Sequence, residues 1–141
     1  MATILITDDE KNVRDVMSKM LFMMGHKIVS VSNGFEALRL FCENQIDLVI
    51  TDLDMPVMDG WILAGRIKQK SPNMPILMVT GDRSTVKTIA AKHAHVDSII
   101  YKPFKIESLK QAVERLLCFD CIHQVEKTSN ISSAYNNAYT L

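Results

Sequence analysis

Five short apolar runs are spaced along the chain. They cover Thr3–Ile6, Ile28–Val31, Leu48–Thr51, Pro75–Thr80 and Ser98–Tyr101. Short runs that stay apolar, without strict alternation, are typical of strands buried on both faces of a parallel sheet. The pattern therefore predicts five strands, the first of them buried on both faces.

Apolar residues recur at helical spacing after each of these runs. The helical stretches are Val13–Met24, Ala37–Cys42, Leu63–Ile67, Val86–Ala90 and Ile106–Leu117. We expect the first helix to end at Gly25 and the fourth to begin near Ser84. Strands that alternate with helices predict a parallel sheet with right-handed crossovers and helices on both faces. Five strands are too few for an eight-stranded barrel, so an open, doubly wound sheet is expected.

Length and composition fit one domain. Of 141 residues, 48% are hydrophobic, and the 16 basic and 16 acidic residues cancel. We place the domain at residues 1–118 and a polar tail, disordered or loosely docked, at residues 119–141. The neutral charge favours neither nucleic acid nor an anionic membrane as a partner. We see no signal peptide and no membrane-spanning stretch, and the three cysteines do not suggest a disulfide framework, so we expect a cytoplasmic protein.

Polar residues that could share one site follow the predicted strands. They are Asp8 and Asp9 after the first strand, Asp52 after the third, Thr80 closing the fourth and Lys102 after the fifth. The carboxyl ends of parallel strands meet at one edge of a sheet, where ligands of α/β proteins bind. Adjacent carboxylates suit a hard divalent cation, and an aspartate can serve as the nucleophile that accepts a phosphoryl group. The pattern suggests a metal-assisted phosphate site.

Each of these residues also has a simpler interpretation. Asp9 or Glu10 could cap and charge the first turn of a helix, Thr80 could be an ordinary β-branched strand residue, and Lys102 could be a solvated lysine. These interpretations explain the residues singly, but they do not explain why all lie at one edge.

The chain resembles the receiver domain of bacterial two-component response regulators from about residue 3 to residue 118. The resemblance rests on several separate motifs in the right order. These are Ile4–Glu10 with Arg14, Asn33–Leu38, Asp47–Gly60, Thr80–Gly81 and Lys102–Phe104. It implies a flavodoxin-like (βα)5 fold whose strands have the order 2-1-3-4-5.

The resemblance also implies a metal site. Asp8 and Asp9 match the acidic pair that binds Mg²⁺, with Mn²⁺ as an alternative. Asp52 would be a further ligand, and the backbone carbonyl of Asp54 matches the main-chain ligand.

The residues around the phosphoryl group are implied in the same way. Asp52 matches the phosphoacceptor, Lys102 the lysine that contacts the phosphate, and Thr80 the hydroxyl that reorients when phosphate arrives. Gly81 matches a small residue that leaves the approach to Asp52 open. Pro103 matches a proline that is commonly preceded by a cis peptide bond.

Some positions depart from the family pattern. Where the family usually has an aromatic residue, three positions before the lysine, this chain has Ile99, and Tyr101 lies beside Lys102. Ile99 and Tyr101 would share one face of a strand, so Tyr101 is a candidate substitute in the switch. Asp54 and Asp82 are acidic residues expected to flank the pocket, where the resemblance implies that they modulate the lifetime of the aspartyl phosphate; they could also be solvated loop residues.

These observations predict a stand-alone receiver in a two-component phosphorelay. It would accept a phosphoryl group on Asp52 from a sensor histidine kinase or a histidine phosphotransfer protein. It would signal to a downstream protein target through helix four, strand five and helix five, as a monomer or a weak, phosphorylation-dependent dimer. It would not be an enzyme in the ordinary sense, and neither nucleic acid nor membrane would be a direct partner.

Two alternatives stay open. Asp52-Leu53-Asp54 is similar to the paired aspartates of haloacid-dehalogenase-type phosphatases, although that pair normally follows the first strand. A receiver-like binding module that is not phosphorylated is the other alternative. Cys118-x-x-Cys121 lacks the further ligands of a structural zinc site, and we interpret it as incidental.

Overall fold

The computed structural model describes the backbone of residues 1–81 and 95–129, and side chains as far as Cys118. Its elements are β1 (Thr3–Thr7), α1 (Lys11–Met23), β2 (Lys27–Val31), α2 (Gly34–Glu43), β3 (Leu48–Asp52), α3 (Gly60–Lys70), β4 (Ile76–Thr80), β5 (Ser98–Tyr101) and α5 (Ile106–Ser129). The helix expected near Ser84 lies outside the described residues.

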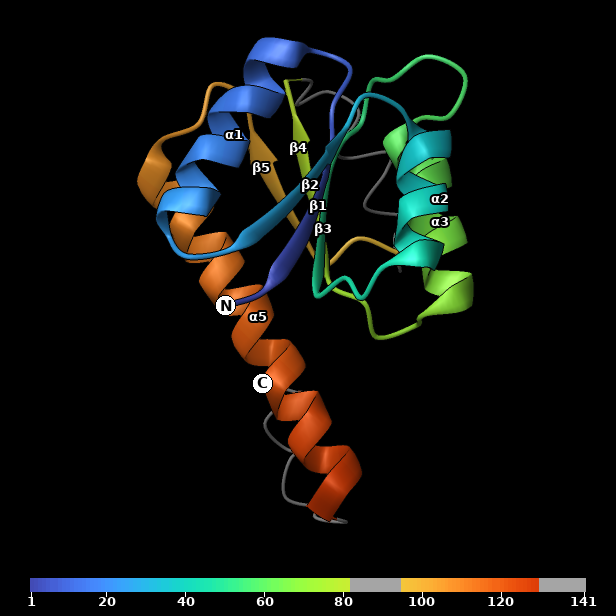
Figure 1. Cartoon of the computed structure of the whole chain (residues 1–141), viewed down its shortest axis with the longest axis vertical. Helices are drawn as coiled ribbons and strands as arrows, with labels where there is room; N and C mark the ends of the chain where they lie inside the picture. Colours follow the sequence, from blue (N-terminus) through green and yellow to red (C-terminus); the bar gives the residue numbers. More distant parts are fainter. Residues whose placement is uncertain (82–94, 130–141) are drawn as a thin grey trace.

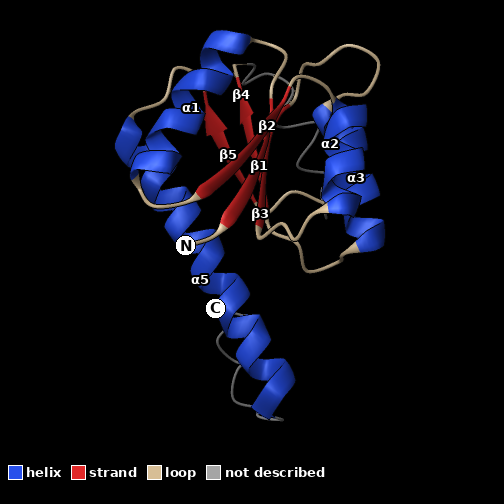
Figure 2. Cartoon of the chain, viewed as in Figure 1, coloured by secondary structure: helices blue, strands red, loops and turns tan. Residues whose placement is uncertain are grey.

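The five strands form one parallel sheet in the order β2-β1-β3-β4-β5, which confirms the predicted flavodoxin-like topology. Helices α1 and α5 cover one face of the sheet, and α2 and α3 cover the other (Figures 1 and 2). Alternate residues of a strand serve the two layers: Ile4 and Ile6 pack with α1 and α5, whereas Leu5 packs with α2 and α3. Because both faces are covered, the inner strands β1, β3 and β4 are buried almost along their whole length, whereas the edge strands β2 and β5 are only partly buried.

The end of α1 follows the sequence prediction. Gly25 has a φ of +92°, a left-handed conformation that glycine adopts without a steric cost. The N–H of His26 donates to the carbonyl of Leu21, and the N–H of Gly25 donates to that of Phe22. These two bonds make a Schellman motif, which turns the chain into β2.

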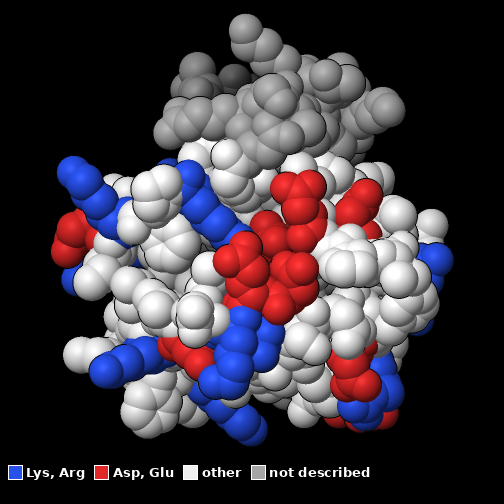
Figure 3. Space-filling view, turned by 90° about the horizontal axis from the view of Figure 1, so that it is seen from above, with Lys and Arg blue, Asp and Glu red and all other residues white. Residues whose placement is uncertain are grey.

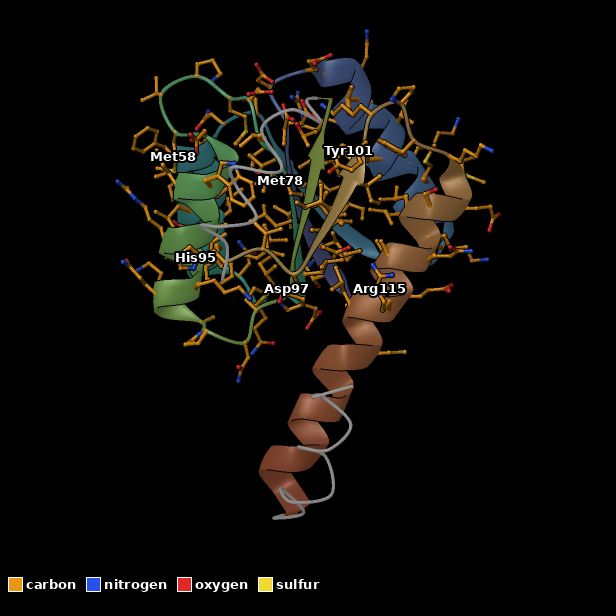
Figure 4. The ribbon with its side chains drawn as sticks, turned by 180° about the vertical axis from the view of Figure 1, so that it is seen from behind. Met58, Met78, His95, Asp97, Tyr101 and Arg115 are labelled. Atoms are coloured by element: carbon orange, nitrogen blue, oxygen red, sulfur yellow. The ribbon has the colours of Figure 1, made fainter. Side chains whose placement is uncertain are left out.

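Two aspartates join the amino ends of neighbouring strands. Asp47, just before β3, donates its N–H to the carbonyl of Thr3 (2.8 Å) and accepts the N–H of Thr3 on Oδ2 (2.8 Å). Asp97, just before β5, makes the same pair of bonds with Ile76 of β4, at 2.9 and 2.8 Å. Lys68 of α3 also contacts Oδ2 of Asp97 at 2.9 Å. Figure 4 shows Asp97 at one end of the sheet and Tyr101 at the other end.

Helix α5 is longer than the apolar stripe predicts. The stripe ends at Leu117, but the helix continues to Ser129. The domain boundary at residue 118 stays a prediction. The last three turns of the helix extend past the ends of the strands, away from the rest of the domain (Figure 1). The backbone of residues 119–129 is thus helical, whereas the structure does not describe residues 130–141.

Candidate functional site

Three carboxylates gather at the carboxyl edge of the sheet. Asp8 and Asp9 follow β1, and Asp52 ends the neighbouring strand β3. Each offers a carboxylate oxygen within 4.8 Å of the others. The side chains of Asp8 and Asp52 are 0% and 5% exposed, whereas Asp9 is exposed. Figure 3 looks onto this edge and shows acidic side chains gathered at its centre beside basic ones.

Local hydrogen bonds hold Asp8 in place. Its carboxylate Oδ1 accepts the backbone N–H of Glu10 at 2.8 Å, which fixes the turn from β1 into α1. The guanidinium of Arg14 donates to the backbone carbonyl of Asp8 at 2.7 Å. Oδ2 of Asp8 points toward the other side of the site, where Lys102 contacts it.

Lys102 joins the two buried carboxylates. Its Nζ lies 3.0 Å from Oδ2 of Asp8 and 3.4 Å from Oδ1 of Asp52. Its backbone N–H donates to the carbonyl of Thr80 at 2.8 Å, which ties the residue after β5 to the end of β4. The peptide bond between Lys102 and Pro103 is cis, as the resemblance implies. Asp8 and Lys102, which are 94 positions apart in the sequence, are thus in direct contact.

Burial and charge act together on the acid–base properties of the site. Burial, together with the nearby charge of Asp8, raises the pKa of Asp52 from 3.8 to about 6, although Lys102 acts in the opposite direction. Burial acts to lower the pKa of the Lys102 ammonium, but Asp8 and Asp52 outweigh it, and that pKa is raised. The two groups therefore form an ion pair at neutral pH, at a cost in hydration for Asp52.

The loop after Asp52 can approach closely because of a glycine. The N–H of Gly60 donates to the carbonyl of Leu53 at 2.9 Å, and Asp59 caps α3 by accepting the N–H of Ile62 at 2.9 Å. A Cβ on Gly60 would collide with the backbone carbonyl of Asp52. The Asp59-Gly60 pair is the signal in the sequence for this capped turn, whereas no local pattern indicates the close approach of Gly60 to Asp52.

The same loop holds one strained residue. Val57 has a φ of +71° and is 86% exposed. The N–H of Met58 donates to the carbonyl of Pro56 at 2.8 Å across it, so Val57 is the centre of a γ-turn. A β-branched residue at positive φ is uncommon, and nothing in its spacing indicated this conformation.

The fourth and fifth strands place the expected switch residues on one face. Thr80 is fully buried and lies opposite Tyr101, while Met78 lies opposite Ile99. Ile99 packs against a small cluster around Met78 and Leu53, the residue next to Asp52. Figure 4 shows Met78 and Tyr101 on these neighbouring strands. An aliphatic side chain therefore occupies the position where the family usually has an aromatic one.

The remaining predicted residues differ in how far the structure describes them. Asp54 is exposed, and the role of its carbonyl as a metal ligand stays a prediction. No described atom lies within 4 Å of the point where a Cβ on Gly81 would be, so within the described residues this position is open. Asp82 lies outside the described residues.

The donor set fits a magnesium ion. Magnesium prefers oxygen ligands and is usually held by one or two carboxylates together with water and phosphate oxygens. Asp8, Asp9 and Asp52 supply such oxygens at one exposed edge. Lys102 offsets one of the three negative charges, and Arg14 contacts a carbonyl rather than a carboxylate, so the cluster keeps an excess of negative charge.

An apolar cleft of about 450 Å³ opens beside this site. It is lined by Asn12, Val13, Val16 and Met20 of α1 and by Lys102, Pro103 and Phe104. Val16 is 49% exposed. The cleft therefore presents an apolar face of α1 next to the residue that contacts both buried carboxylates.

Comparison with known proteins agrees with the geometry. Residues 4–114 match the family model of the response regulator receiver domain, and the chain belongs to this family. Response regulators are the phosphorylated partners in two-component systems; their receiver domains are signalling phosphoacceptors rather than enzymes in the ordinary sense, and they interact with histidine kinases and downstream targets.

Individual relatives support the same assignment. The chain is 32% identical over 114 residues to the probable transcriptional regulator ycf27 of Cyanidium caldarium, covering 81% of this chain and 45% of that protein. It is 32% identical over 116 residues to the DNA-binding transcriptional regulator NtrC of Azospirillum brasilense, and the match covers 82% of this chain and 24% of that protein. The chain thus spans half or less of the length of these curated relatives.

Solved structures resemble the fold closely. A receiver domain protein from Clostridium thermocellum has a TM-score of 0.80 at 29% identity, covering 86% of this chain and 98% of that one. The response regulator TrrA from Thermotoga maritima, in complex with Mg²⁺-BeF, has a TM-score of 0.77 at 33% identity, covering 83% and 100%. None of the helices in the described part of this chain has the length and apolar character needed to cross a membrane.

Proposed function

We propose that this chain accepts a phosphoryl group on the carboxylate of Asp52 and thereby changes its contacts with other proteins. The observation that carries the proposal is the setting of Asp52. Its side chain is 5% exposed, lies 3.4 Å from the Lys102 ammonium, and shares an acidic cluster with Asp8 and Asp9. This setting combines a nucleophile with groups that can neutralise transferred charge.

In the proposed reaction a carboxylate oxygen of Asp52 attacks phosphorus in a phosphohistidine. The P–N bond of the donor breaks as the new P–O bond forms, and the leaving imidazole takes up a proton. A divalent cation held by the oxygens of Asp8, Asp9 and Asp52 would supply positive charge against the phosphoryl oxygens. Lys102 binds one of those oxygens, and the hydroxyl of Thr80 donates to another.

The raised pKa of Asp52 sets a limit on this reaction. Attack needs the ionised carboxylate, and a pKa of about 6 leaves most molecules ionised at neutral pH. This limit belongs to the metal-free protein, because a cation held by Asp52 would favour the ionised carboxylate and lower its pKa.

The test is incubation with Mg²⁺ and acetyl phosphate, followed by intact-mass measurement. We expect the mass of one phosphoryl group to be added and then slowly lost. Asp52→Asn should abolish the addition, whereas the exposed neighbour Asp54→Asn should retain it. Repeated turnover of acetyl phosphate would instead indicate a phosphatase, and no labelling would indicate a binding module; either result contradicts the proposal.

We further propose that the apolar cleft receives the phosphodonor protein. It lies next to Lys102, and its apolar lining includes the half-exposed Val16. Val16→Asp should slow transfer from a histidine kinase or phosphotransfer protein at least tenfold and leave labelling by acetyl phosphate unchanged. Phe22→Asp is the matched control, because Phe22 is exposed on the same helix and does not line the cleft. Equal loss in the two variants would contradict this docking site.

Action through separate protein partners, rather than through an attached output domain, stays a prediction, as does the cytoplasmic location. The curated relatives are mostly multidomain regulators at least twice as long as the matched region.

A further inference from the structure

Arg14 lies one turn into α1 and reaches back to the end of β1. Its Nη1 donates to the backbone carbonyl of Asp8 at 2.7 Å, and this bond is partly buried. Its own backbone N–H donates to the carbonyl of Glu10 at 3.1 Å, which is the first helical bond of α1. A hydrogen bond from an ionised donor is roughly twice as strong as one between neutral groups. The guanidinium therefore ties the first turn of α1 to the end of β1.

The peptide group that joins Asp8 to Asp9 is held from two sides. Arg14 holds its carbonyl oxygen, and the N–H of Glu10, one residue further on, donates to Oδ1 of Asp8 at 2.8 Å. Because a peptide group is planar, fixing its carbonyl also fixes the direction of its N–H and the position of the Cα atom of Asp9. The contact between Arg14 and Asp8 thus sets the backbone from which the side chain of Asp9 extends.

The three carboxylates of the site differ in how they are held. Asp8 and Asp52 are buried, and both contact Lys102, at 3.0 and 3.4 Å. Asp9 is exposed, and within the described residues its carboxylate makes no hydrogen bond or ion pair. Its carboxylate oxygen nevertheless lies within 4.8 Å of those of Asp8 and Asp52. The backbone of Asp9, rather than a polar contact of its side chain, therefore keeps this carboxylate in the cluster.

The charge of Arg14 by itself would have a different effect on a cation. Arg14 donates to a carbonyl and not to a carboxylate, so it does not occupy the oxygens that a cation would bind. A positive charge near the cluster repels a divalent cation. Removing that charge would therefore tighten cation binding, whereas removing a support of Asp9 would weaken it. The two roles predict changes in affinity of opposite sign.

We propose that Arg14 is a positioning residue for the divalent cation: it holds the carbonyl of Asp8 and thereby keeps the carboxylate of Asp9 beside those of Asp8 and Asp52. This inference rests on the cation of the proposed function. Replacing a group that holds a metal ligand in place typically weakens metal binding by about 10–100-fold. Arg14 acts on one of three ligands and only through the backbone, so a loss near the lower end of this range is expected.

The first test is calorimetric titration of the full chain with Mg²⁺. Arg14→Met keeps the apolar stem and removes the guanidinium, and the dissociation constant for Mg²⁺ should rise about tenfold. Lys11→Met is the matched control, because it removes one positive charge from the same turn of α1. Lys11 is exposed and lies 2.8 Å from Asp15. This control should bind Mg²⁺ at least as tightly as the parent.

Two results of this titration would overturn the proposal. The first is an Arg14→Met protein that binds Mg²⁺ as tightly as the parent or more tightly, because the charge of Arg14 would then outweigh any support of Asp9. The second is an equal loss of affinity in Lys11→Met.

Hydrogen exchange in EDTA separates positioning from a general loss of stability. The amide of Glu10 should exchange about tenfold faster in Arg14→Met than in the parent, because the turn that it closes has lost its second support. The amide of Asp47, which donates to the carbonyl of Thr3 at the opposite edge of the sheet, should be affected far less. Equal acceleration at both amides would mean that Arg14 only stabilises the fold, and would overturn the proposal.

Labelling by acetyl phosphate links this role to the proposed function. In Arg14→Met, the Mg²⁺ concentration that gives half-maximal labelling should rise by the same factor as the dissociation constant. A mere loss of folded protein would lower the maximal rate and leave this concentration unchanged, which would count against the proposal. If Asp52 is not labelled in the parent although the expected Mg²⁺ affinities are found, the proposed function fails and the role of Arg14 stands. A parent chain that does not bind Mg²⁺ would overturn the role of Arg14 together with the cation of the proposed function.

Discussion

Replacing Asp52 with asparagine removes a buried charge and nearly conserves the shape of the side chain. In the metal-free protein, burial raises the pKa of this carboxyl from 3.8 to about 6. Multiplying that difference by about 1.36 kcal/mol per pH unit gives about 3 kcal/mol. The ionised form of Asp52 thus costs the folded state about 3 kcal/mol relative to the unfolded chain at pH 7.5.

The sign of this contribution depends on whether the folded or the unfolded chain binds the Asp52 proton more tightly. Because the folded pKa is higher, the contribution of Asp52 to stability is fully present below pH 3.8 and is lost as the pH rises through about 6. Asp52→Asn carries no such titration. It should therefore be more stable than the parent chain by about 3 kcal/mol at pH 7.5, and the gap should close as the pH approaches 4.

Urea unfolding in EDTA, followed by circular dichroism across this pH range, measures the gap. Groups that do not interact with Asp52 contribute equally to both proteins and cancel in the difference, and Lys102 stays protonated in both across this pH range. Asp54→Asn, a change at an exposed residue of the same loop, is the control. Adding Mg²⁺ should stabilise the parent chain more than Asp52→Asn and narrow the gap. A gap that does not depend on pH, or a less stable Asp52→Asn protein at pH 7.5, would refute the reasoning.

Three further changes test the framework around the site. Gly60→Ala should destabilise the protein by about 1–3 kcal/mol in urea and slow labelling by acetyl phosphate, because the new Cβ displaces the carbonyl of Asp52; parent-like stability would count against the close approach. Val57→Gly should raise the thermal midpoint by a few degrees, because it relieves a strain of about 1–2 kcal/mol at positive φ, offset in part by the entropy of glycine in the unfolded chain. A lower midpoint would contradict this. Asp97→Ala should cost about 1–3 kcal/mol and speed hydrogen exchange at the Ile76 amide, with acetyl phosphate labelling unchanged; a slowly exchanging amide would disprove the role of the carboxylate.

The convergence of the site could be predicted from sequence because parallel strands impose it. Once the runs before Asp8, Asp52 and Lys102 are assigned as strands of one sheet, their following residues must meet at one edge. The spacing of the apolar residues was sufficient to assign these strands. The structure brings the side chains of Asp8, Asp52 and Lys102 into contact.

Other features could not be predicted from local patterns. The close approach of Gly60 to Asp52 depends on how a loop folds back, and the positive φ of Val57 opposes the intrinsic preference of valine. The apolar stripe that faces the core ends at Leu117, so it does not predict the continuation of α5 to Ser129. Periodicity reports which side of a helix is buried in its own domain, and it does not report how far the helix continues.

The bonds made by Asp47 and Asp97 have a consequence for how the domain can move. Each aspartate fastens two adjacent strands through both its backbone and its side chain, at the edge farthest from Asp52. Strands β1 and β3, and likewise β4 and β5, therefore cannot slide past each other at their starting ends. A conformational change at the Asp52 edge is therefore expected in the loops and side chains of that edge. The register of the strands at the opposite edge should stay the same.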